Sequence, residues 1–419
     1  MIQKILIVSL MYIEKMVHSL SDFTYKKIFY HTQKSKVSRL RQKDQIKVLY
    51  MMPCLQKWKT ESLYLAMVKH PRFLPVIGVP LLSADYPSES FSKYHNLLDY
   101  LNAKNYSFYE LKDKNDLRRI SPDIVFLQEA AGGGIREELL CKKYTECLYC
   151  YVSYAFETVK IPQLLNTFYQ NICWQNYSES DIVIDSIRDV MDNHGRNLLY
   201  TGVPTSDQLM QPETSYINPW RNPSEKKRII WAPHHTIDNH TQTQYSTFLM
   251  VADAMLQLSQ KYSDKVQWAF KPHPALRSKL NGLWGKEKTD QYYNYWENSD
   301  CTQFEDGEYI GLFKYSDAII HDCGSFTVEY LYMKKPCMYL VNGENHDLNP
   351  FGEKCYNQYY FGRNEQDIEK FVINVINGVD SRKQEREVFF NKYLQPPHGK
   401  TASENIINAI LGQEEYSYQ

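Results

Sequence analysis

The sequence predicts an α/β protein with two domains, each built on a parallel sheet that is covered by helices. Short buried strands alternate with helical segments over residues 46–152 and again over residues 228–341, and this alternation is typical of βαβ units. The length of 419 residues agrees with two or three domains. Hydrophobic residues make up 43% of the chain and charged residues 23%, which excludes collagen-like, disordered and low-complexity proteins.

A basic segment, residues 1–45, is expected to precede the first domain as an amphipathic extension. Residues 1–50 contain ten Lys and Arg against three acidic residues, a net charge of +7, so the remainder carries −8 of the total of −1. The apolar residues among these cations suit a helix on an anionic membrane surface, and equally a helix that packs on its own domain. The longest uncharged run, Ile5 to Ile13, is shorter than the roughly 20 residues of a spanning helix, and no cleavage site indicates a secretory signal. The balanced total charge argues against a nucleic-acid partner.

The first domain is expected over residues 46–215. It opens with the buried strand Ile46 to Met52, which Pro53 ends. Its further elements in chain order are a helix over 58–69, an apolar run over 73–79, a helix over 91–102, and strands over 124–127 and 148–152.

The second domain is expected over residues 216–395, after a linker rich in Pro, Gly, Ser and Asn at 202–223. Its strands are predicted at 228–233, 266–270, 318–320 and 337–341, and its helices at 246–261, 309–315 and 325–333, with an irregular aromatic segment at 283–301. Residues 396–419 are expected to form a C-terminal helix that crosses back to the first domain. Two Rossmann-like halves of this kind place their carboxyl-end loops across a cleft, where ligands bind.

The densest group of chemically active residues follows the strand that ends at Ile320. This turn consists of Asp322, Cys323, Gly324, Ser325 and Phe326. The amide groups of a Gly-Ser pair at the start of a helix suit a phosphate. Glu329 lies one helical turn later and would accept hydrogen bonds from ribose hydroxyls. A plain helix cap by Asp322 or Ser325 explains the same pattern without a ligand.

Cations and imidazoles follow two further strands of the second domain. Lys271 and His273 come directly after the strand 266–270, in a loop that Pro272 and Pro274 stiffen. Both side chains suit a pyrophosphate, as charge-assisted donors or as a general acid. The strand before it is followed by Pro233, His234, His235 and Thr236. Three histidines at two strand ends favour a functional edge over three separate structural roles.

Metal binding is the competing interpretation of this edge. His234, His235, His273 and Asp322 carry ligand types that zinc and iron accept. However, adjacent histidines are expected to point to opposite sides of an extended segment, and no HxxxH or HExxH spacing is present. We therefore predict no metal. The nine cysteines form no CxxC pair, which indicates a reduced, cytosolic protein, and neither a P-loop nor a GxSxG motif occurs.

The order of these motifs resembles the CDP-glycerol glycerophosphotransferases, the family of teichoic-acid polymerases and primases and their capsule-synthesis relatives. The matching segments are Ala232-Pro233, His273-Pro274, Ser316-Asp317, Asp322 to Tyr330, Lys335-Pro336 and Gly399 to Ser403. The resemblance implies a GT-B fold, with an acceptor domain followed by a nucleotide domain. It further implies that His273 lies beside the pyrophosphate, that Gly324 and Ser325 hold a phosphate, and that Glu329 meets the ribose.

The activity implied is transfer of a glycerol-phosphate or related alditol-phosphate unit from a CDP-linked donor to an acceptor hydroxyl, with release of CMP and without a tightly bound cofactor. The acceptor would be a polymer or a lipid-linked molecule. The protein would be a cytoplasmic enzyme that associates peripherally with the inner face of the cell membrane. The same fold and turn would also suit a glycosyltransferase that uses an NDP-sugar. An inactive scaffold of a surface-polymer complex is the third alternative.

The chain departs from the family pattern at three places. Gly324 stands where a Ser is usual, and His234-His235-Thr236 stands where Thr-Trp-Arg is usual. The Trp-His-Gly segment of the polymerases, whose His is thought to activate the acceptor, is missing after the strand 148–152. Glu129, which follows the strand 124–127, is the candidate base in its place, although a solvated loop glutamate fits equally well.

Overall fold

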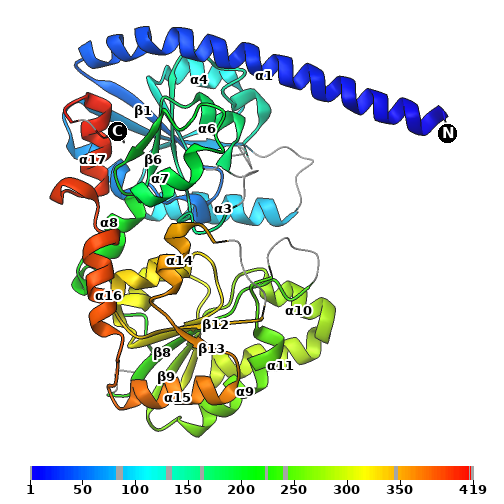
Figure 1. The fold of residues 1–419 in the computed structure, drawn as a ribbon, viewed down its shortest axis with the longest axis vertical. Helices are drawn as coiled ribbons and strands as arrows, with labels where there is room; N and C mark the ends of the chain where they lie inside the picture. The colour runs from blue at the N-terminus through cyan, green and yellow to red at the C-terminus, as the bar shows by residue number, and fades with distance from the viewer. Residues whose placement is uncertain are drawn as a thin grey trace. The chain divides into compact units, whose positions relative to one another are not determined.

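The computed structural model describes residues 2–81, 88–128, 135–160, 165–221, 225–238, 244–343, 348–414 and 416, with side chains from residue 22 on except at 88–90 and 137. The chain divides into two compact units (Figure 1). The first comprises residues 1–155, 161–205 and 396–419, and the second comprises residues 156–160 and 206–395.

The first unit is a seven-stranded parallel sheet in the order β3-β2-β1-β4-β5-β6-β7. Its strands are β1 Ile46–Met51, β2 Phe73–Pro80, β3 Phe108–Leu111, β4 Ile124–Leu127, β5 Leu148–Val152, β6 Gln175–Ser178 and β7 Leu198–Tyr200. Its helices are α1 Ile2–Gln42, α2 Glu61–Lys69, α3 Ser88–Ala103, α4 Lys114–Ile120, α6 Phe168–Ile172, α7 Asp181–Arg188 and α17 Ala402–Leu411. Helix α8 Pro204–Met210 leads into the second unit.

The sheet of the first unit has an apolar core on each face, because its central strands are buried on both sides. Val48 and Tyr50 of β1 belong to one core, whereas Leu49 and Met51 belong to the other. The alternation follows from the two-residue period of a strand. Helix α17 contacts α2 and thereby brings the C-terminal segment onto this unit.

The second half of helix α1 packs on the first unit. Phe29 and Leu40 are buried, and the Tyr30 hydroxyl donates a hydrogen bond to Asn171 O at 2.8 Å. Lys36 Nζ donates to Cys147 O at 3.2 Å. Among the residues that the structure describes, no helix combines the length and apolarity needed to cross a membrane.

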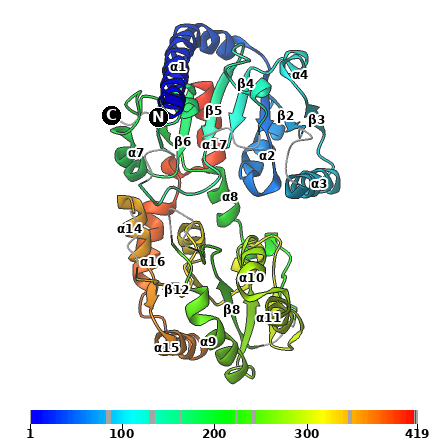
Figure 2. The ribbon, with the colours of Figure 1, turned by 90° about the vertical axis from the view of Figure 1, so that its right-hand side faces the viewer.

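The second unit is a six-stranded parallel sheet in the order β10-β9-β8-β11-β12-β13. Its strands are β8 Lys227–Ala232, β9 Val266–Phe270, β10 Thr302–Phe304, β11 Ala318–His321, β12 Cys337–Leu340 and β13 Tyr360–Gly362. Its helices are α9 Phe248–Lys261, α10 Leu276–Trp284, α11 Lys286–Asn298, α12 Ile310–Tyr315, α13 Phe326–Glu329, α14 Pro350–Tyr356, α15 Glu365–Ile376 and α16 Lys383–Phe389. Helices α10 and α11 lie on one side of the sheet and α14 and α16 on the other (Figure 2).

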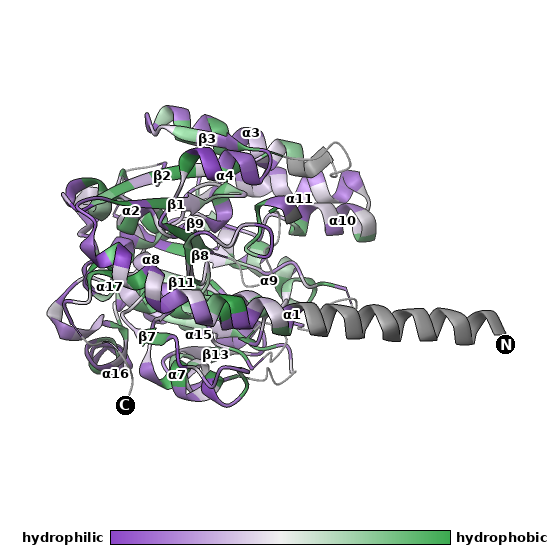
Figure 3. Ribbon diagram, turned by 90° about the horizontal axis from the view of Figure 1, so that it is seen from above, coloured by the Kyte–Doolittle hydropathy of each residue, from purple (hydrophilic) through white to green (hydrophobic). Residues whose placement is uncertain are grey.

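The core of the second unit is rich in aromatic rings. Trp231 of β8 stacks on Phe248 of α9 with 5.6 Å between ring centroids, and contacts Phe270 of β9 at 4.9 Å. Apart from Lys227 and Arg228 at the start of β8 and Gln267 in β9, these central strands consist of hydrophobic residues (Figure 3), as expected for strands of a parallel sheet that is covered on both faces.

The predicted fold class, two Rossmann-like α/β domains, is confirmed, and two local predictions are wrong. Residues 286–298 form helix α11 rather than an irregular segment, with Tyr292, Tyr293 and Trp296 buried on one face. The chain passes from the first unit to the second between residues 205 and 206, within the segment predicted as a linker, which also contains helix α8. The helix predicted at 325–333 is a four-residue α13 followed by the 3-10 helix Tyr330–Met333.

Candidate functional site

Three loops of the second unit meet at one edge of its sheet. Strands β9, β8 and β11 are neighbours and run parallel, so their carboxyl ends lie together. Lys271 and His273 follow β9, the segment Pro233 to Thr236 follows β8, and Asp322 follows β11. These residues therefore lie at one edge, as their positions after predicted strands indicate.

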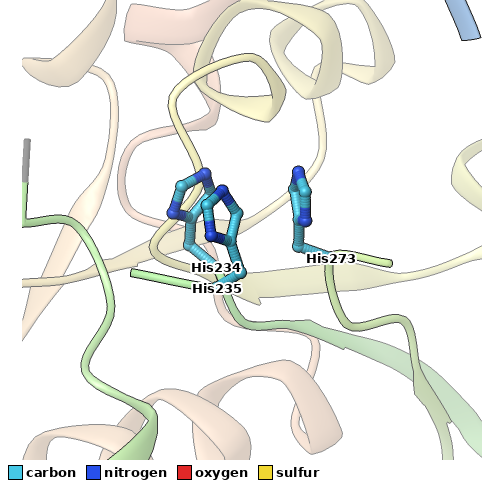
Figure 4. Close-up of side chains that lie close together, drawn as sticks. All are labelled: His234, His235 and His273. Atoms are coloured by element: carbon cyan, nitrogen blue, oxygen red, sulfur yellow. The ribbon is translucent and has the colours of Figure 1, made fainter. Parts of the chain in front are cut away.

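The histidines His234, His235 and His273 form a cluster (Figure 4). The ring centroids of His234 and His273 are 5.1 Å apart, and those of His235 and His273 are 4.1 Å apart. One nitrogen from each ring lies within 4.8 Å of the other two. The prediction that the adjacent pair points to opposite sides is wrong, because β8 ends at Ala232 and the chain bends at His235. The two rings are 4.3 Å apart.

Asp322 fixes the loop that carries this cluster. Its carboxylate is fully buried and accepts hydrogen bonds from His234 N at 2.5 Å, Thr247 N at 2.6 Å and Thr247 Oγ1 at 2.9 Å. Burial raises the pKa of Asp322 to about 6, although these hydrogen bonds act in the opposite direction. Asp322 therefore joins the ends of β8 and β11 to the start of α9 and does not cap α13.

The hydrogen-bond partners of Nδ1 assign the tautomers of two histidines. His273 Nδ1 accepts from Ala275 N at 3.1 Å, which places the proton of the neutral ring on Nε2. Thr236 Oγ1 accepts from Tyr245 N and Ser246 N, so both of its lone pairs are used and its hydroxyl proton is directed to His234 Nδ1 at 3.1 Å. In the neutral rings of His234 and His273, the proton is therefore assigned to Nε2.

This tautomer pattern suits an oxyanion better than a metal ion. A metal on Nε2 of His273 would require a proton on Nδ1, opposite the Ala275 N–H that Nδ1 now accepts. Phosphoryl oxygens, by contrast, accept from Nε2–H without a change of tautomer. His235 adds a third ring, and burial together with Lys279 lowers its pKa, which keeps it neutral.

Lys271 lies in the same loop as His273, but its side chain is directed to the segment 305–308. It is buried, and its Nζ donates to Gly307 O at 2.7 Å. Burial lowers the pKa of Lys271, while Glu305, Glu308 and Asp306 act to raise it. The ammonium group thus stabilises the acidic loop 305–308, and its predicted contact with a phosphate stays a prediction.

The turn after β11 has both buried and exposed members. Cys323 is buried and its Sγ donates to Ala232 O at 3.1 Å, whereas Ser325 is exposed and makes no capping hydrogen bond. A Cβ on Gly324 would meet the Tyr245 ring at an ordinary distance of 3.6 Å, so the site has room for the Ser that the family pattern carries there. Phe326 packs on Phe313, with ring centroids 5.0 Å apart.

Glu329 is directed away from solvent. Only 3% of the residue is exposed, and its carboxylate is hydrogen-bonded to Tyr309. Its predicted contact with a ribose stays a prediction. The candidate base Glu129 lies outside the described residues.

A match to a family model shows to which protein family the chain belongs. The model described as CDP-Glycerol:Poly(glycerophosphate) glycerophosphotransferase matches residues 168–412, more than half of the sequence. The chain belongs to this family. It is thus a transferase of the CDP-glycerol glycerophosphotransferase type, and the matched region contains the whole histidine cluster.

Solved structures with the same fold include members of two enzyme groups. This glycerophosphotransferase is 13% identical to a variant of the wall teichoic acid polymerase TagF, with a TM-score of 0.58 over 94% of this chain and 98% of that one. A TagF structure soaked with CDPG gives 14% identity and a TM-score of 0.59 over 94% and 99%. The structure of UDP-GlcNAc 2-epimerase from Neisseria meningitidis bound to UDP-GlcNAc gives 14% identity and a TM-score of 0.56 over 88% of this chain and 100% of that one. These likenesses establish the GT-B fold, and no curated protein sequence matches the chain.

Sequence reasoning missed two residues that shape the site of this glycerophosphotransferase. Thr247 donates twice to Asp322 from the residue before α9, and Tyr245 packs its ring against His234 at 5.2 Å. A threonine directly before a helix is a signal for a cap. Here its side chain makes no capping hydrogen bond and binds Asp322, 75 residues away, which no local pattern indicates.

Proposed function

We propose that this protein transfers a glycerol-phosphate or related alditol-phosphate unit from a CDP-linked donor to an acceptor hydroxyl of a surface polymer, such as teichoic acid or capsule, and releases CMP. The observation that carries this proposal is the pair of Nε2–H donors of His234 and His273 at the carboxyl edge of the second sheet. This edge is where parallel sheets bind nucleotides.

The chemistry requires few covalent steps from the protein. The acceptor oxygen attacks the β-phosphorus of the donor, the bond from that phosphorus to the bridging oxygen breaks, and CMP leaves with the bonding electrons. The acceptor proton passes to a base, for which Glu129 remains our candidate. Negative charge grows on the bridging oxygen, and imidazole donors that are already oriented stabilise it without reorganisation.

Two substitutions at His273 separate the role of its Nε2–H hydrogen-bond donor from the structural role of its Nδ1 acceptor. In His273→Asn, the amide oxygen replaces Nδ1 as acceptor for Ala275 N, but the Nε2–H donor is lost. In His273→Gln, the amide nitrogen replaces the Nε2–H donor, but the acceptor for Ala275 N is lost. We expect His273→Asn to lower the rate by about 10²- to 10³-fold and His273→Gln to retain more of it.

The assay follows nucleotide release from CDP-glycerol with a glycerol-phosphate primer, and chromatography identifies the nucleotide. CMP supports transfer of a phosphorylated alditol, whereas CDP or UDP from an NDP-sugar would support a glycosyltransferase. Activity of His273→Asn within threefold of wild type, with an unchanged thermal midpoint, would remove His273 from the mechanism. The absence of a thermal shift with CDP-glycerol, CDP-ribitol, UDP-sugars and CMP would favour the scaffold alternative.

Association with an anionic membrane surface is the second part of the proposal. It rests on the net charge of +7 in residues 1–50, and the exposed Lys27, Lys34 and Arg39 of α1 supply cations beside the packed half of this helix. Flotation with phosphatidylglycerol vesicles should be lost when these three residues are changed to Glu, while phosphatidylcholine vesicles should bind neither protein. Equal flotation of both proteins would contradict the membrane role of α1.

A further inference from the structure

A cationic feature of the second unit lies at the opposite edge of its sheet from the histidines. A cavity of about 610 Å³ opens where β8 begins and in front of β11 and β12. Of the described residues that line it, seven are Lys or Arg and four are Asp or Glu. We call it the lysine pocket. It includes two segments, Ser316-Asp317 and Lys335-Pro336, that belong to the family pattern but have no part in the proposed reaction.

The charge in the lysine pocket is more positive than this count indicates. Asp380 pairs with the buried guanidinium of Arg386, which does not line the cavity. Asp317 is 3.3 Å from Lys227 Nζ and also accepts from Arg228 N at 2.8 Å. Two of the four acids are therefore already neutralised by cations, one of which lies outside the pocket.

Several cations of the pocket are crowded and partly buried. Burial and the nearby Lys335 lower the pKa of Lys314 to about 8. Arg228 Nε is buried and has no hydrogen-bond partner among the described residues. An anion in the cavity would relieve the repulsion among these cations, and phosphate oxygens are strong acceptors for guanidinium and ammonium groups.

An apolar cavity adjoins the lysine pocket. It has a volume of about 450 Å³ and shares Glu213, Lys314, Lys334 and Lys335 with its neighbour. Its other walls include Met210, Met333 and Phe390. Lys334 lies between the two environments, with its Nζ 4.3 Å from the centroid of the Phe390 ring. A cationic and an apolar compartment that meet at three lysines and one glutamate, a net charge of +2, suit a ligand with a phosphate at one end and an apolar chain at the other.

We propose that these two cavities bind an amphiphilic phosphate ester of the phospholipid type, with its phosphate in the lysine pocket and its chain in the apolar cavity. This site is independent of the histidine cluster and of the transfer reaction. Electrostatic attraction to the phosphate and burial of the chain would each contribute to affinity, so both ends of the ligand are required for tight binding.

The test measures binding of dihexanoyl phosphatidylglycerol, below its micellar concentration, to the full-length chain by calorimetry, with glycerol 3-phosphate as the headgroup probe. We expect the lipid to bind at least tenfold more tightly than glycerol 3-phosphate. The double variant Lys314→Met with Lys334→Asn should weaken both probes at least tenfold, and Asn accepts the positive φ of 57° at position 334. The variant Met210→Gln should weaken the lipid alone.

Two controls distinguish this site from a general effect of surface charge and from binding at the histidine cluster. The exposed Lys370, which lines neither cavity, is changed to Met and should leave both affinities within twofold. The variant His273→Asn should likewise retain lipid binding, even where it abolishes transfer. Equal affinity for the lipid and for glycerol 3-phosphate would overturn the proposal that the ligand is an amphiphile whose chain occupies the apolar cavity. Unchanged binding by the double variant, with an unchanged thermal midpoint, or loss of lipid binding in His273→Asn, would overturn the site.

Discussion

The buried His321 should make the second unit sensitive to acid. This residue ends β11, is fully buried, and accepts from Cys323 N through Nδ1 at 3.1 Å. The rings of Tyr339 and Tyr359 lie 5.4 and 5.2 Å from its own. Burial lowers the pKa of His321 to about 3, against about 6.5 for an unfolded histidine. The fold therefore accommodates the neutral ring of His321, and its free energy of unfolding falls when the pH is low enough to protonate this histidine in the unfolded chain.

The sign and size of the effect follow from these two pKa values. Because the folded pKa lies below the unfolded one, the stability contributed by neutral His321 is complete above pH 6.5 and is lost as the pH falls toward 3. Each pH unit in this window costs about 1.4 kcal/mol, so the loss between pH 7.5 and pH 5 is about 2 kcal/mol. The raised pKa of Asp322 acts in the opposite direction below pH 6, and therefore a single protein does not isolate the histidine.

The comparison of wild type with His321→Asn isolates it, since Asp322 is present in both proteins. The Asn oxygen replaces Nδ1 as acceptor for Cys323 N and does not titrate. Urea unfolding, followed by tryptophan fluorescence at pH 7.5, 6 and 5, should show the wild type losing about 2 kcal/mol relative to the variant. The exposed His95→Asn serves as the matched control. Parallel pH profiles of wild type and His321→Asn would refute the reasoning that a neutral, buried imidazole is present.

Three further substitutions test packing and capping by urea unfolding at pH 7.5. Gly352→Ala should cost about 3 kcal/mol or more, because the added Cβ would overlap the carbonyl group of Thr158; a loss below about 1 kcal/mol would contradict this contact. Arg386→Ala should cost about 3 to 5 kcal/mol, since it leaves Asp380 without its buried partner; a neutral effect would show that water solvates the carboxylate. Thr401→Ala removes the capping box of α17 and should cost about 1 kcal/mol, and a stabilised variant would exclude the cap.

The strand ends of the second unit could be predicted from sequence because a parallel sheet collects them at one edge. His273 and Asp322 are nearly 50 residues apart, yet a short apolar run directly before each one was enough to place both. The orientation of side chains within the loops could not be predicted in the same way. Lys271 follows its strand as His273 does, but its ammonium group binds Gly307 O, and only the fold of the loop 305–308 determines that partner.

Helix α11 shows a different limit of sequence reasoning. Its aromatic residues Tyr292, Tyr293 and Trp296 have the spacing of one helical face, but tyrosine and tryptophan are poor helix formers and the exposed positions are polar. The helix is stabilised by tertiary packing, since Trp296 lies 5.2 Å from Phe270 and 5.3 Å from Trp231. The low helix propensity of these residues therefore predicted an irregular segment, whereas packing against the aromatic core stabilises a helix at 286–298.

Helix dipoles account for part of the charge at the two edges of the second sheet. Helices enter the amino edge with their carbonyl ends, and Lys335 caps one of them by donating to Lys314 O at 2.5 Å and Ser316 O at 2.7 Å at the end of α12. At the carboxyl edge, by contrast, the anionic Asp322 accepts from Thr247 N, directly before α9. Capping accounts for the ammonium group of Lys335. Lys334 ends the 3-10 helix Tyr330–Met333 through its backbone N–H, and its ammonium group lies over the Phe390 ring instead of capping a helix. A substitution at Lys334 therefore tests the proposed ligand site without removing a helix cap, whereas a substitution at Lys335 would do both.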